Sequence, residues 1–331
     1  MSAENPLLQT NVDVVSEIEN GAAGARILAE PRSLSAIIFG FVELMKPELT
    51  SLSVFTALCG FYLAHVGVWS WSNIVLFLVT ALGTLLVGGG AGALNEYIER
   101  GYDAEMKRTE KRPLPSARIS PNEGLIFGIS ISVAGVLMLT FLVNVLTGFL
   151  ASLTLVTYLF FYTPMKRISP FSTLIGGIPG AIPPMMGWAA VRNDVTVEAW
   201  VLFAILFLWQ MPHFYSLAWM YRKDYSRAGY KMLTVFDESG RMTSRQIIFN
   251  SLALIPISVI PTVIGMTRTF YFIGAAICGF VFLAYGLRFM ILSMRSDDEA
   301  MMKTNLSARK LFFASLWYLP ALLALMAIDK R

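Results

Sequence analysis

Long apolar segments separated by short polar loops recur along this chain from about residue 48 to near its end. Each segment is long enough to cross a bilayer as one helix, which needs about twenty apolar residues. The pattern therefore predicts an all-α polytopic membrane protein with nine membrane-spanning helices. The predicted spans lie near residues 48–67, 72–95, 122–142, 146–163, 172–191, 197–219, 246–266, 270–293 and 308–327.

The segments before the first predicted span have a different character. Residues 1–33 are polar and poor in aromatic side chains, and they lack the basic start and apolar core of a cleaved signal. We expect a disordered cytosolic tail there. Residues 34–45 are amphipathic and suited to the membrane interface, and Pro47 then begins the first span. Residues 34–331 are therefore predicted to form a single nine-helix membrane domain.

Composition excludes a soluble domain. Of the 331 residues, 56% are hydrophobic and only 15% are charged, which is far more apolar than a soluble protein of this length. The two cysteines, Cys59 and Cys278, lie in separate apolar segments and suggest neither a disulfide framework nor a metal-ligand spacing. The net charge of +4 is concentrated in particular loops, so it indicates membrane topology and no nucleic-acid partner.

The distribution of basic residues predicts the orientation of the chain. Lys and Arg gather in the loops after the second, fourth, sixth and eighth predicted spans, whereas the other loops hold almost none. Because cytoplasmic loops carry the excess of Lys and Arg, these four loops and the amino terminus are expected on the cytoplasmic side. Nine spans then place Lys330 and Arg331 on the other side, a small misfit that the loop asymmetry outweighs.

The stretch from Asn95 to Pro115 carries the most informative polar residues. Asn95, Glu99 and Asp103 are four residues apart, so a continuing helix turns each only about 40° from the last and points all three to one side. An amide and two carboxylates suit Mg²⁺, which completes its shell with water and substrate phosphate. Four cations that suit phosphate follow at once, namely Lys107, Arg108, Lys111 and Arg112.

Two interpretations of this stretch remain open. A charge-rich loop after a membrane helix is often only a solvated, positive-inside flank. Carboxylates that recur on one helical face at the membrane boundary are costly without partners, however. That cost favours a metal-diphosphate clamp.

A second polar segment ends the sixth predicted span and resembles the one that ends the second span. The resemblance suggests a four-helix pseudo-repeat. We expect the second and sixth spans to face each other across one site. Within the second polar segment, His213 is flanked in sequence by aromatic residues. It is either a histidine hydrogen-bonded within the bundle or a functional residue, namely an acid/base group, a metallo-porphyrin ligand or a partner that stabilises a carbocation. Lys223 and Asp224 follow and can complete the clamp from the opposite helix. His65 has no polar neighbours in sequence and is expected to be structural.

A third segment combines basic residues with glycine and proline. Lys166 and Arg167, after the fourth predicted span, can reach the same diphosphate. The fifth span contains IGGIPGAIPPMMGW, residues 175–188. This composition allows either a broken helix beside a cavity or a small-residue face for close helix packing.

These motifs carry a resemblance to a known family. Asn95, Glu99 and Asp103, followed by Lys107-Arg108-Thr109 and Arg112-Pro113-Leu114, resemble the first signature of the UbiA-type intramembrane prenyltransferases. Residues 212–214 (Pro-His-Phe), 217–218 and 224–229, together with Tyr162-Thr163, Lys166-Arg167 and Ile175-Gly176-Gly177, are similar to the haem-modifying branch, the protoheme IX farnesyltransferases or haem O synthases. The resemblance spans about residues 40–325.

The sequence departs from the family pattern at two places. Glu99 stands where the family usually has Asp, so the side chain is one methylene longer. Relatives that act on quinone precursors carry a second Asp-rich motif, whereas the matching region here has His213 and a single Asp224. The second departure argues against the quinone branch.

The resemblance implies nine helices around a lipid-accessible cavity and transfer of a farnesyl group from farnesyl diphosphate to a vinyl group of haem B. It implies Mg²⁺ held by Asn95, Glu99 and Asp103, and phosphates bound by cations such as Arg108, Arg112 and Lys166. His213 is expected on the haem side, as axial ligand or as a base that orients water. The implied location is a bacterial inner membrane, surrounded by lipid, with haem A synthase or terminal oxidase assembly factors as downstream partners.

Two rival functions stay open from the sequence. A prenyltransferase that acts on a quinone or chlorin precursor has the same clamp and a different acceptor. A secondary transporter also places polar residues in facing helices of a repeat. The transporter would need neither magnesium nor a prenyl diphosphate.

Overall fold

The computed structural model describes residues 33–295 and 298–331. The tail predicted over residues 1–33 lies, apart from Ser33, outside the described residues. The chain divides into two units, Met1–Phe39 and Gly40–Arg331. The interfacial segment predicted at residues 34–45 is a helix, α2 (Leu34–Leu44), which crosses this division.

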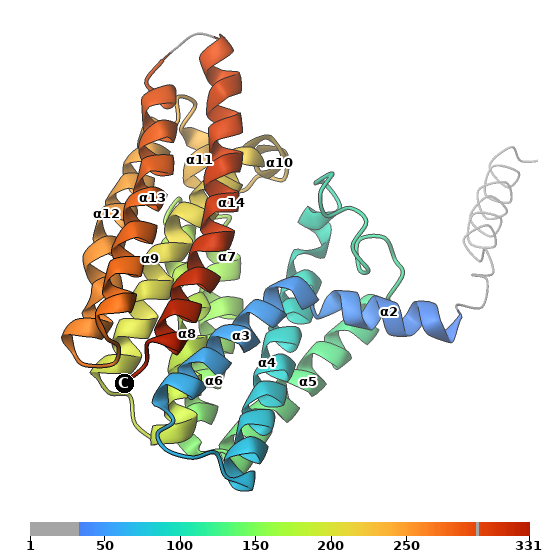
Figure 1. The fold of residues 1–331 in the computed structure, drawn as a ribbon. Helices are drawn as coiled ribbons and strands as arrows, with labels where there is room; N and C mark the ends of the chain where they lie inside the picture. The colour runs from blue at the N-terminus through green and yellow to red at the C-terminus, as the bar shows by residue number, and fades with distance from the viewer. Residues whose placement is uncertain (1–32, 296–297) are drawn as a thin grey trace, which may run out of the picture. The chain divides into compact units, whose positions relative to one another are not determined.

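The second unit is a bundle of long helices (Figure 1). Its elements, with the short helices between the long ones, are α3 (Pro47–Ala64), α4 (Trp71–Asp103), α5 (Pro121–Leu142), α6 (Val145–Val156), the π-helix η1 (Thr157–Tyr162), α7 (Thr163–Met165), α8 (Ser172–Arg192), α9 (Val197–Met220), α10 (Arg222–Arg227), α11 (Leu233–Phe236), α12 (Arg241–Val263), α13 (Thr269–Ser293) and α14 (Asp298–Ile328). In the described ranges, β pairing is limited to one isolated bridge between Thr267 and Lys330.

Eight of the described helices are long and apolar enough to cross a membrane, which makes the chain a multi-pass membrane protein. Eight of the nine predicted spans are confirmed on this criterion, and the remaining one is not confirmed. The first predicted span, residues 48–67, is the 18-residue helix α3, which is not among the eight. The second predicted span does not end at residue 95 but continues to Asp103.

The helices form two neighbouring groups with α8 between them. Helices α3, α4, α5 and α6 pack in sequence on one side, and α9, α12, α13 and α14 pack on the other. Helix α8 contacts α3 and α6 in the first group and α9 in the second, and α8 and α9 are the most buried spans.

Small residues allow α3 and α8 to approach closely. A Cβ atom added to Gly187 would lie 1.7 Å from the carbonyl oxygen of Ala57, and one added to Gly60 would lie 2.1 Å from the carbonyl oxygen of Pro184. Helix α8 runs without interruption from Ser172 to Arg192, although three prolines lie inside it. The packing-face interpretation of this segment is therefore confirmed, and the broken-helix alternative was wrong.

Glycines in α4 allow the turn between α2 and α3 to lie close to the part of α4 that carries Asn95. A Cβ atom on Gly92 would lie 3.2 Å from the carbonyl oxygens of Leu44 and Met45. Lys46, in the same turn, adopts a left-handed backbone conformation with φ 49°. The close approach places the Lys46 side chain over the segment that carries Asn95.

Candidate active site

The three predicted metal ligands lie on one continuous helix. Helix α4 extends through Asp103, and its residues Asn95, Glu99 and Asp103 are 2%, 5% and 1% exposed as whole residues. The four-residue spacing therefore points them to one face of α4, as the sequence predicted. Two buried carboxylates near one helix end need compensating positive charge.

A different segment supplies a cation to each of these three side chains. The pairs are Lys46 Nζ donating to Asn95 Oδ1 at 2.7 Å, Lys166 Nζ donating to Glu99 Oε1 at 2.8 Å and Oε2 at 3.0 Å, and Arg112 Nη1 donating to Asp103 Oδ2 at 2.7 Å. The cations come from the turn before α3, the loop after α7 and the loop after α4. Tertiary structure thus assembles a cluster of three oxygen-bearing side chains and three cations.

Lys46 is a functional candidate that the sequence analysis missed. Burial, followed by repulsion from Arg112, lowers the pKa of Lys46 to about 7, although Glu99 and Asp103 act in the opposite direction. A titrating amine near neutral pH is typical of functional sites. The signal available in the sequence was a single Lys directly before Pro47 at the start of a span, which a solvated flank explains equally well.

The other two cations remain firmly charged. Burial lowers the pKa of Lys166, but the Glu99 carboxylate outweighs burial and holds the pKa well above its usual range. Burial also lowers the pKa of Arg112, and the ion pair with Asp103 raises it above its ordinary value. Both side chains are therefore permanent cations at neutral pH, as the binding of a phosphate requires.

A π-helical turn positions the residues after the fourth span. The sequence predicted a regular helix at residues 146–163, but Thr157–Tyr162 form a π-helix, a form that is often found at functional sites. The Thr163 hydroxyl donates to the Tyr158 carbonyl at 2.8 Å and accepts from Asn95 Nδ2 at 3.1 Å. These bonds orient the Asn95 amide so that its oxygen faces Lys46.

The loop after α4 is held against that helix by two buried polar groups. Glu96 is 1% exposed and accepts a hydrogen bond from the Leu114 backbone nitrogen at 3.0 Å. The Thr109 hydroxyl donates to the Asp103 carbonyl at 2.8 Å. Together these bonds fix the loop that carries Arg112. The sequence analysis did not single out Glu96, although it lies three residues before Glu99 and close to the charges of Lys46, Arg112 and Asp103.

Aromatic side chains connect the basic loops after α4 and α9. The guanidinium of Arg108 lies 5.1 Å from the centre of the Tyr221 ring, and its Nη2 is 3.4 Å from the Tyr225 hydroxyl. The guanidinium of Arg167 lies 4.1 Å from the centre of the Tyr102 ring. The two basic loops predicted to share one site therefore do meet, through tyrosines.

The backbone makes a further connection between these loops. The Lys231 nitrogen donates to the Lys166 carbonyl at 2.8 Å. Tyr230, next to it, is 2% exposed, and burial first and the nearby Glu99 second raise the pKa of its hydroxyl. The segment after α10 thus covers the Glu99–Lys166 pair.

Three other residues predicted for the diphosphate clamp, Lys107, Lys223 and Asp224, lie outside the central cluster of ion pairs. Lys107 and Lys223 are exposed. Asp224 is partly buried and lies 3.5 Å from Arg227 on the same short helix, α10. These residues are near the loops of the site, but the ion pairs of the central cluster do not include them in the described part of the chain.

His213 belongs to a different group of residues. Its ring stacks between Trp209 and Phe312 at 5.2 and 4.8 Å, and Nδ1 lies 2.7 Å from the Ser315 hydroxyl. These partners come from α9 itself and from α14. Within the described residues, none of the hydrogen bonds or ring contacts of His213 reaches α4.

The cluster suits a divalent cation by its chemistry. In the described residues no group of three His, Cys, Asp or Glu side chains is placed to hold a metal. The predicted set consists of two carboxylates and an amide, and Mg²⁺ commonly takes only one or two carboxylates from the protein. Asn95, Glu99 and Asp103 fit such an ion, provided that the three cations move aside.

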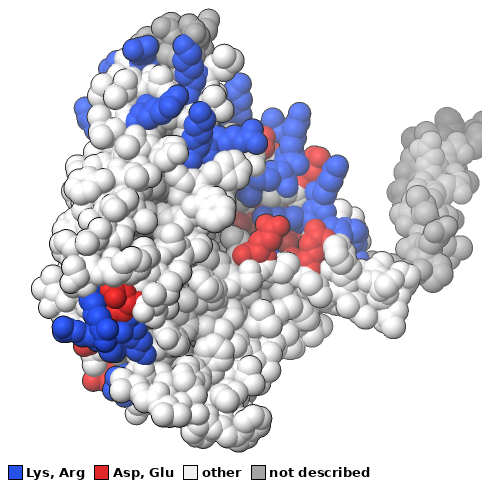
Figure 2. Space-filling view, in the orientation of Figure 1, with Lys and Arg blue, Asp and Glu red and all other residues white. Residues whose placement is uncertain are grey.

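Charged side chains are unevenly distributed over the surface of the molecule. Figure 2 shows Lys and Arg gathered with several carboxylates at one end of the molecule and a second, smaller charged group at the opposite end. A broad band without charged side chains separates the two. Such a band is typical of a surface in contact with lipid.

Comparison with known proteins agrees with this architecture. The model of the UbiA prenyltransferase family matches residues 53–326. The chain is 43% identical to a protoheme IX farnesyltransferase from Solibacter usitatus, over 88% of this chain and 98% of the relative. It is 42% identical to one from Opitutus terrae, over 88% and 94% of the two chains.

Solved structures share the fold. A digeranylgeranylglyceryl phosphate synthase superimposes with a TM-score of 0.71 at 16% identity, covering 88% of this chain and 98% of that one. A UbiA homologue from Archaeoglobus fulgidus, whose structure contains GPP and Mg²⁺, superimposes with a TM-score of 0.57 at 15% identity, covering 87% and 99%.

Proposed function

The chain belongs to the UbiA prenyltransferase family, and we propose that it transfers the farnesyl group of farnesyl diphosphate to a vinyl group of haem B, giving haem O. The observation that carries this proposal is the 43% identity to a protoheme IX farnesyltransferase over almost the whole of that relative. The cluster of two carboxylates, an amide and three cations supports the same chemistry, because diphosphate departure needs concentrated positive charge.

Asn95, Glu99 and Asp103 would hold Mg²⁺, which would supply positive charge to the leaving diphosphate. The ion pairs then exchange partners. Lys166 and Arg112 would leave their carboxylates and donate to phosphate oxygens, and Glu99 and Asp103 would be free to hold the metal ion. In such an exchange Glu99, Asp103, Lys166 and Arg112 would each keep an opposite charge beside them, so the exchange would have little desolvation cost.

Lys46 is positioned to take part in the same exchange. Its ammonium lies 2.7 Å from the Asn95 amide oxygen, which is one of the three proposed metal ligands. An arriving diphosphate raises the affinity of Lys46 for its proton, because negative charge opposes the effect of burial. Lys46 thereby becomes a third donor to the phosphates, with Arg108 and Arg167 contributing from the rim.

The transfer proceeds through a farnesyl cation. The bond between carbon 1 of the farnesyl group and the diphosphate oxygen breaks, and its electron pair leaves with the diphosphate. The vinyl π electrons of haem B form the new carbon–carbon bond, water captures the cation left beside the porphyrin, and a proton is released. Tyr162 lies beside Lys166, and its ring centre is 5.4 Å from that of Tyr158; both rings can stabilise positive charge through their faces.

His213 acts on the haem side in this proposal. The Ser315 hydroxyl occupies Nδ1, which directs any contact with haem iron or with the captured water to Nε2. The rings of Trp209 and Phe312 on its two sides form an apolar wall suited to a porphyrin plane.

The basic loops give the orientation. The cluster lies at the end of the bundle where the loops after α4, α7 and α9 meet, and these loops are rich in Lys and Arg. We therefore assign this end and the amino terminus to the cytoplasmic side of a bacterial inner membrane.

The proposed activity is tested with membranes that contain the full chain, supplied with haem B, farnesyl diphosphate and Mg²⁺. Chromatography and mass spectrometry of the extracted pigment should detect haem O. Asp103→Ala should abolish the product while the protein stays in the membrane. The matched control is Glu105→Ala, an exposed carboxylate two residues away, which should retain activity.

A parallel reaction with a hydroxybenzoate in place of haem B distinguishes the acceptors. Prenylated hydroxybenzoate without haem O would assign the chain to the quinone branch. Full activity of Asp103→Ala would remove that residue from the metal site.

A further inference from the structure

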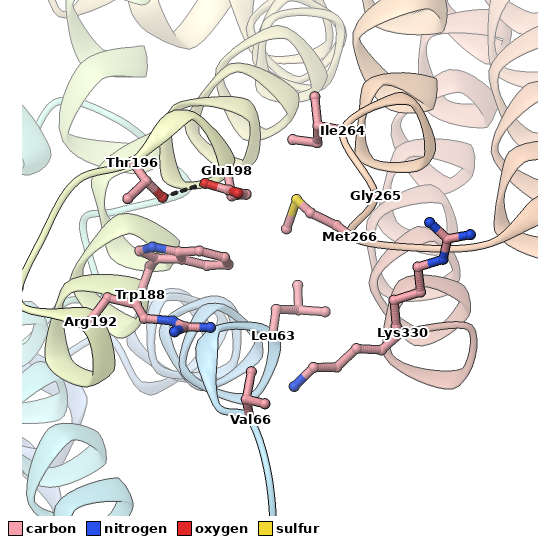
Figure 3. Close-up of a pocket in the computed structure, with 11 residues that line it drawn as sticks. Leu63, Val66, Trp188, Arg192, Thr196, Glu198, Ile264, Gly265, Met266 and Lys330 are labelled. Atoms are coloured by element: carbon pink, nitrogen blue, oxygen red, sulfur yellow. Dashed lines mark hydrogen bonds between the residues drawn. The ribbon is translucent and has the colours of Figure 1, made fainter.

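A second hollow lies far from the proposed active site. Its volume is about 340 Å³, and it lies where α3, α8, α12 and α14 end and α9 begins (Figure 3). The α8 helix runs from Ser172, near the Lys166 loop, to Arg192, which lines the hollow. Its 21 residues correspond to about 30 Å at 1.5 Å per residue. The hollow is therefore at the opposite end of the bundle and shares no residue with the cluster around Asn95.

The wall of the hollow combines apolar side chains with cations. Leu63, Ile264 and Met266 contribute the apolar part, and Arg192, Lys330 and Arg331 contribute three positive charges. The single carboxylate, Glu198, accepts a hydrogen bond from the Thr196 hydroxyl. Among the side chains that line the hollow, cations therefore outnumber carboxylates by three to one.

Two of the cations point toward each other. Figure 3 shows the guanidinium of Arg192 and the ammonium of Lys330 extending from opposite sides of the hollow. Lys330 also donates to the carbonyls of Tyr62 and His65 at the end of α3, which fixes its position. Burial, and then the charge of Arg192, lower the pKa of Lys330. In residues 33–295 and 298–331, neither Arg192 nor Arg331 forms an ion pair with a carboxylate.

Converging like charges over a cavity are unfavourable unless an anion lies between them. Trp69 in the neighbouring loop and Trp71 at the start of α4 are 36% and 77% exposed, and exposed Trp side chains mark the membrane–water interface. Trp188 also lines the hollow, is 5% exposed, and has an indole nitrogen without a hydrogen-bond partner in the described structure. The expected ligand is thus an anion with an apolar portion, at the level of lipid headgroups.

We propose that this hollow binds the phosphodiester headgroup of an anionic phospholipid from the leaflet opposite the active site. Arg192 and Lys330 donate to the phosphate, and the acyl chains leave along the apolar wall at Leu63 and Val66. Basic pockets between membrane helices are known to hold anionic headgroups. The lipid joins the ends of α3, α8 and α14 and so ties the two groups of helices together. This proposal does not depend on the prenyl acceptor.

The experiment uses the full chain, purified in detergent with equal amounts of phosphatidylglycerol and phosphatidylcholine, and counts bound lipids by native mass spectrometry. The wild type should retain one phosphatidylglycerol in preference to phosphatidylcholine. Arg192→Gln combined with Lys330→Gln should reduce that retention at least about tenfold, equivalent to about 1.4 kcal/mol. Arg268→Gln, an exposed cation at the same end outside the hollow, is the matched control and should match the wild type.

A second variant keeps every charge. Met266→Trp fills the hollow, because this side chain points into it (Figure 3), and it should also lose the bound lipid. Equal retention of the two lipids by the wild type, undiminished retention in both variants, or equal loss in Arg268→Gln would overturn the proposal. So would displacement of the lipid by excess inorganic phosphate or by farnesyl diphosphate, since either would identify a different phosphate ligand.

Discussion

The Glu99–Lys166 pair offers the sharpest test of the cluster. Its side chains are 6% and 13% exposed and form two hydrogen bonds at 2.8 and 3.0 Å. Lys166→Met leaves the Glu99 carboxylate buried beside Asn95 without its cation. Loss of one partner of a buried pair costs about 3–5 kcal/mol. With some exposure remaining at Lys166, we expect the lower end of that range, about 3 kcal/mol.

The loss should appear as a change in thermal stability. For a domain of this size, about 1 kcal/mol corresponds to about 2–4 °C, so Lys166→Met should lower Tm by about 6–12 °C. Glu99→Gln in the Lys166→Met background removes the unpaired charge and should recover most of this loss. The measurement is thermal unfolding of the four proteins in one detergent, without Mg²⁺ or diphosphate.

Measuring haem O formation in the same variants distinguishes the effect of charge balance on stability from the roles of Glu99 and Lys166 in catalysis. The double variant should be nearly as stable as the wild type and yet make no haem O, because both a metal ligand and a phosphate donor are missing. If the Tm losses of the two single variants simply add in the double variant, the buried pair contributes no coupling energy. That result would refute the exchange of ion pairs on substrate binding.

Three further outcomes are expected. The pKa of Lys46 is about 7 in the folded chain and about 10.4 in the unfolded chain. Between these pH values the unfolded state binds more protons, so the free energy of unfolding rises with pH. Lys46→Met should flatten that rise when stability is measured by chemical denaturation at several pH values, and an equal dependence on pH in the variant and the wild type would contradict the expectation. His213→Ala should lower turnover and alter the absorption spectrum of bound haem, whereas unchanged values would reduce His213 to packing. Gly187→Ala should collapse the yield of folded protein in size-exclusion chromatography, because the new Cβ meets the Ala57 carbonyl at 1.7 Å, while Gly101→Ala, with open space around it, should fold normally.

Local patterns in the sequence were sufficient to predict the helical membrane architecture and the shared face of Asn95, Glu99 and Asp103. Apolar segment length predicted an all-helical membrane protein, because backbone groups in lipid must be satisfied within each segment. The spacing of Asn95, Glu99 and Asp103 predicted a shared face, because helical geometry relates residues four apart irrespective of the rest of the fold. The first predicted span is the 18-residue helix α3, which packs closely against α8, and its place among the membrane-crossing helices is not confirmed by length and composition.

Other features depend on segments that are distant in sequence. Lys46 and Asn95 are 49 residues apart, and Lys166 and Glu99 are 67 apart, so no periodicity connects them. The close approach of α4 to the turn before α3, which Gly92 permits, brings Lys46 to Asn95. His213 likewise lies against Ser315 of α14, 102 residues away. Repeating local geometry can be deduced from the order of residues, whereas the pairing of buried charges depends on which helices pack together.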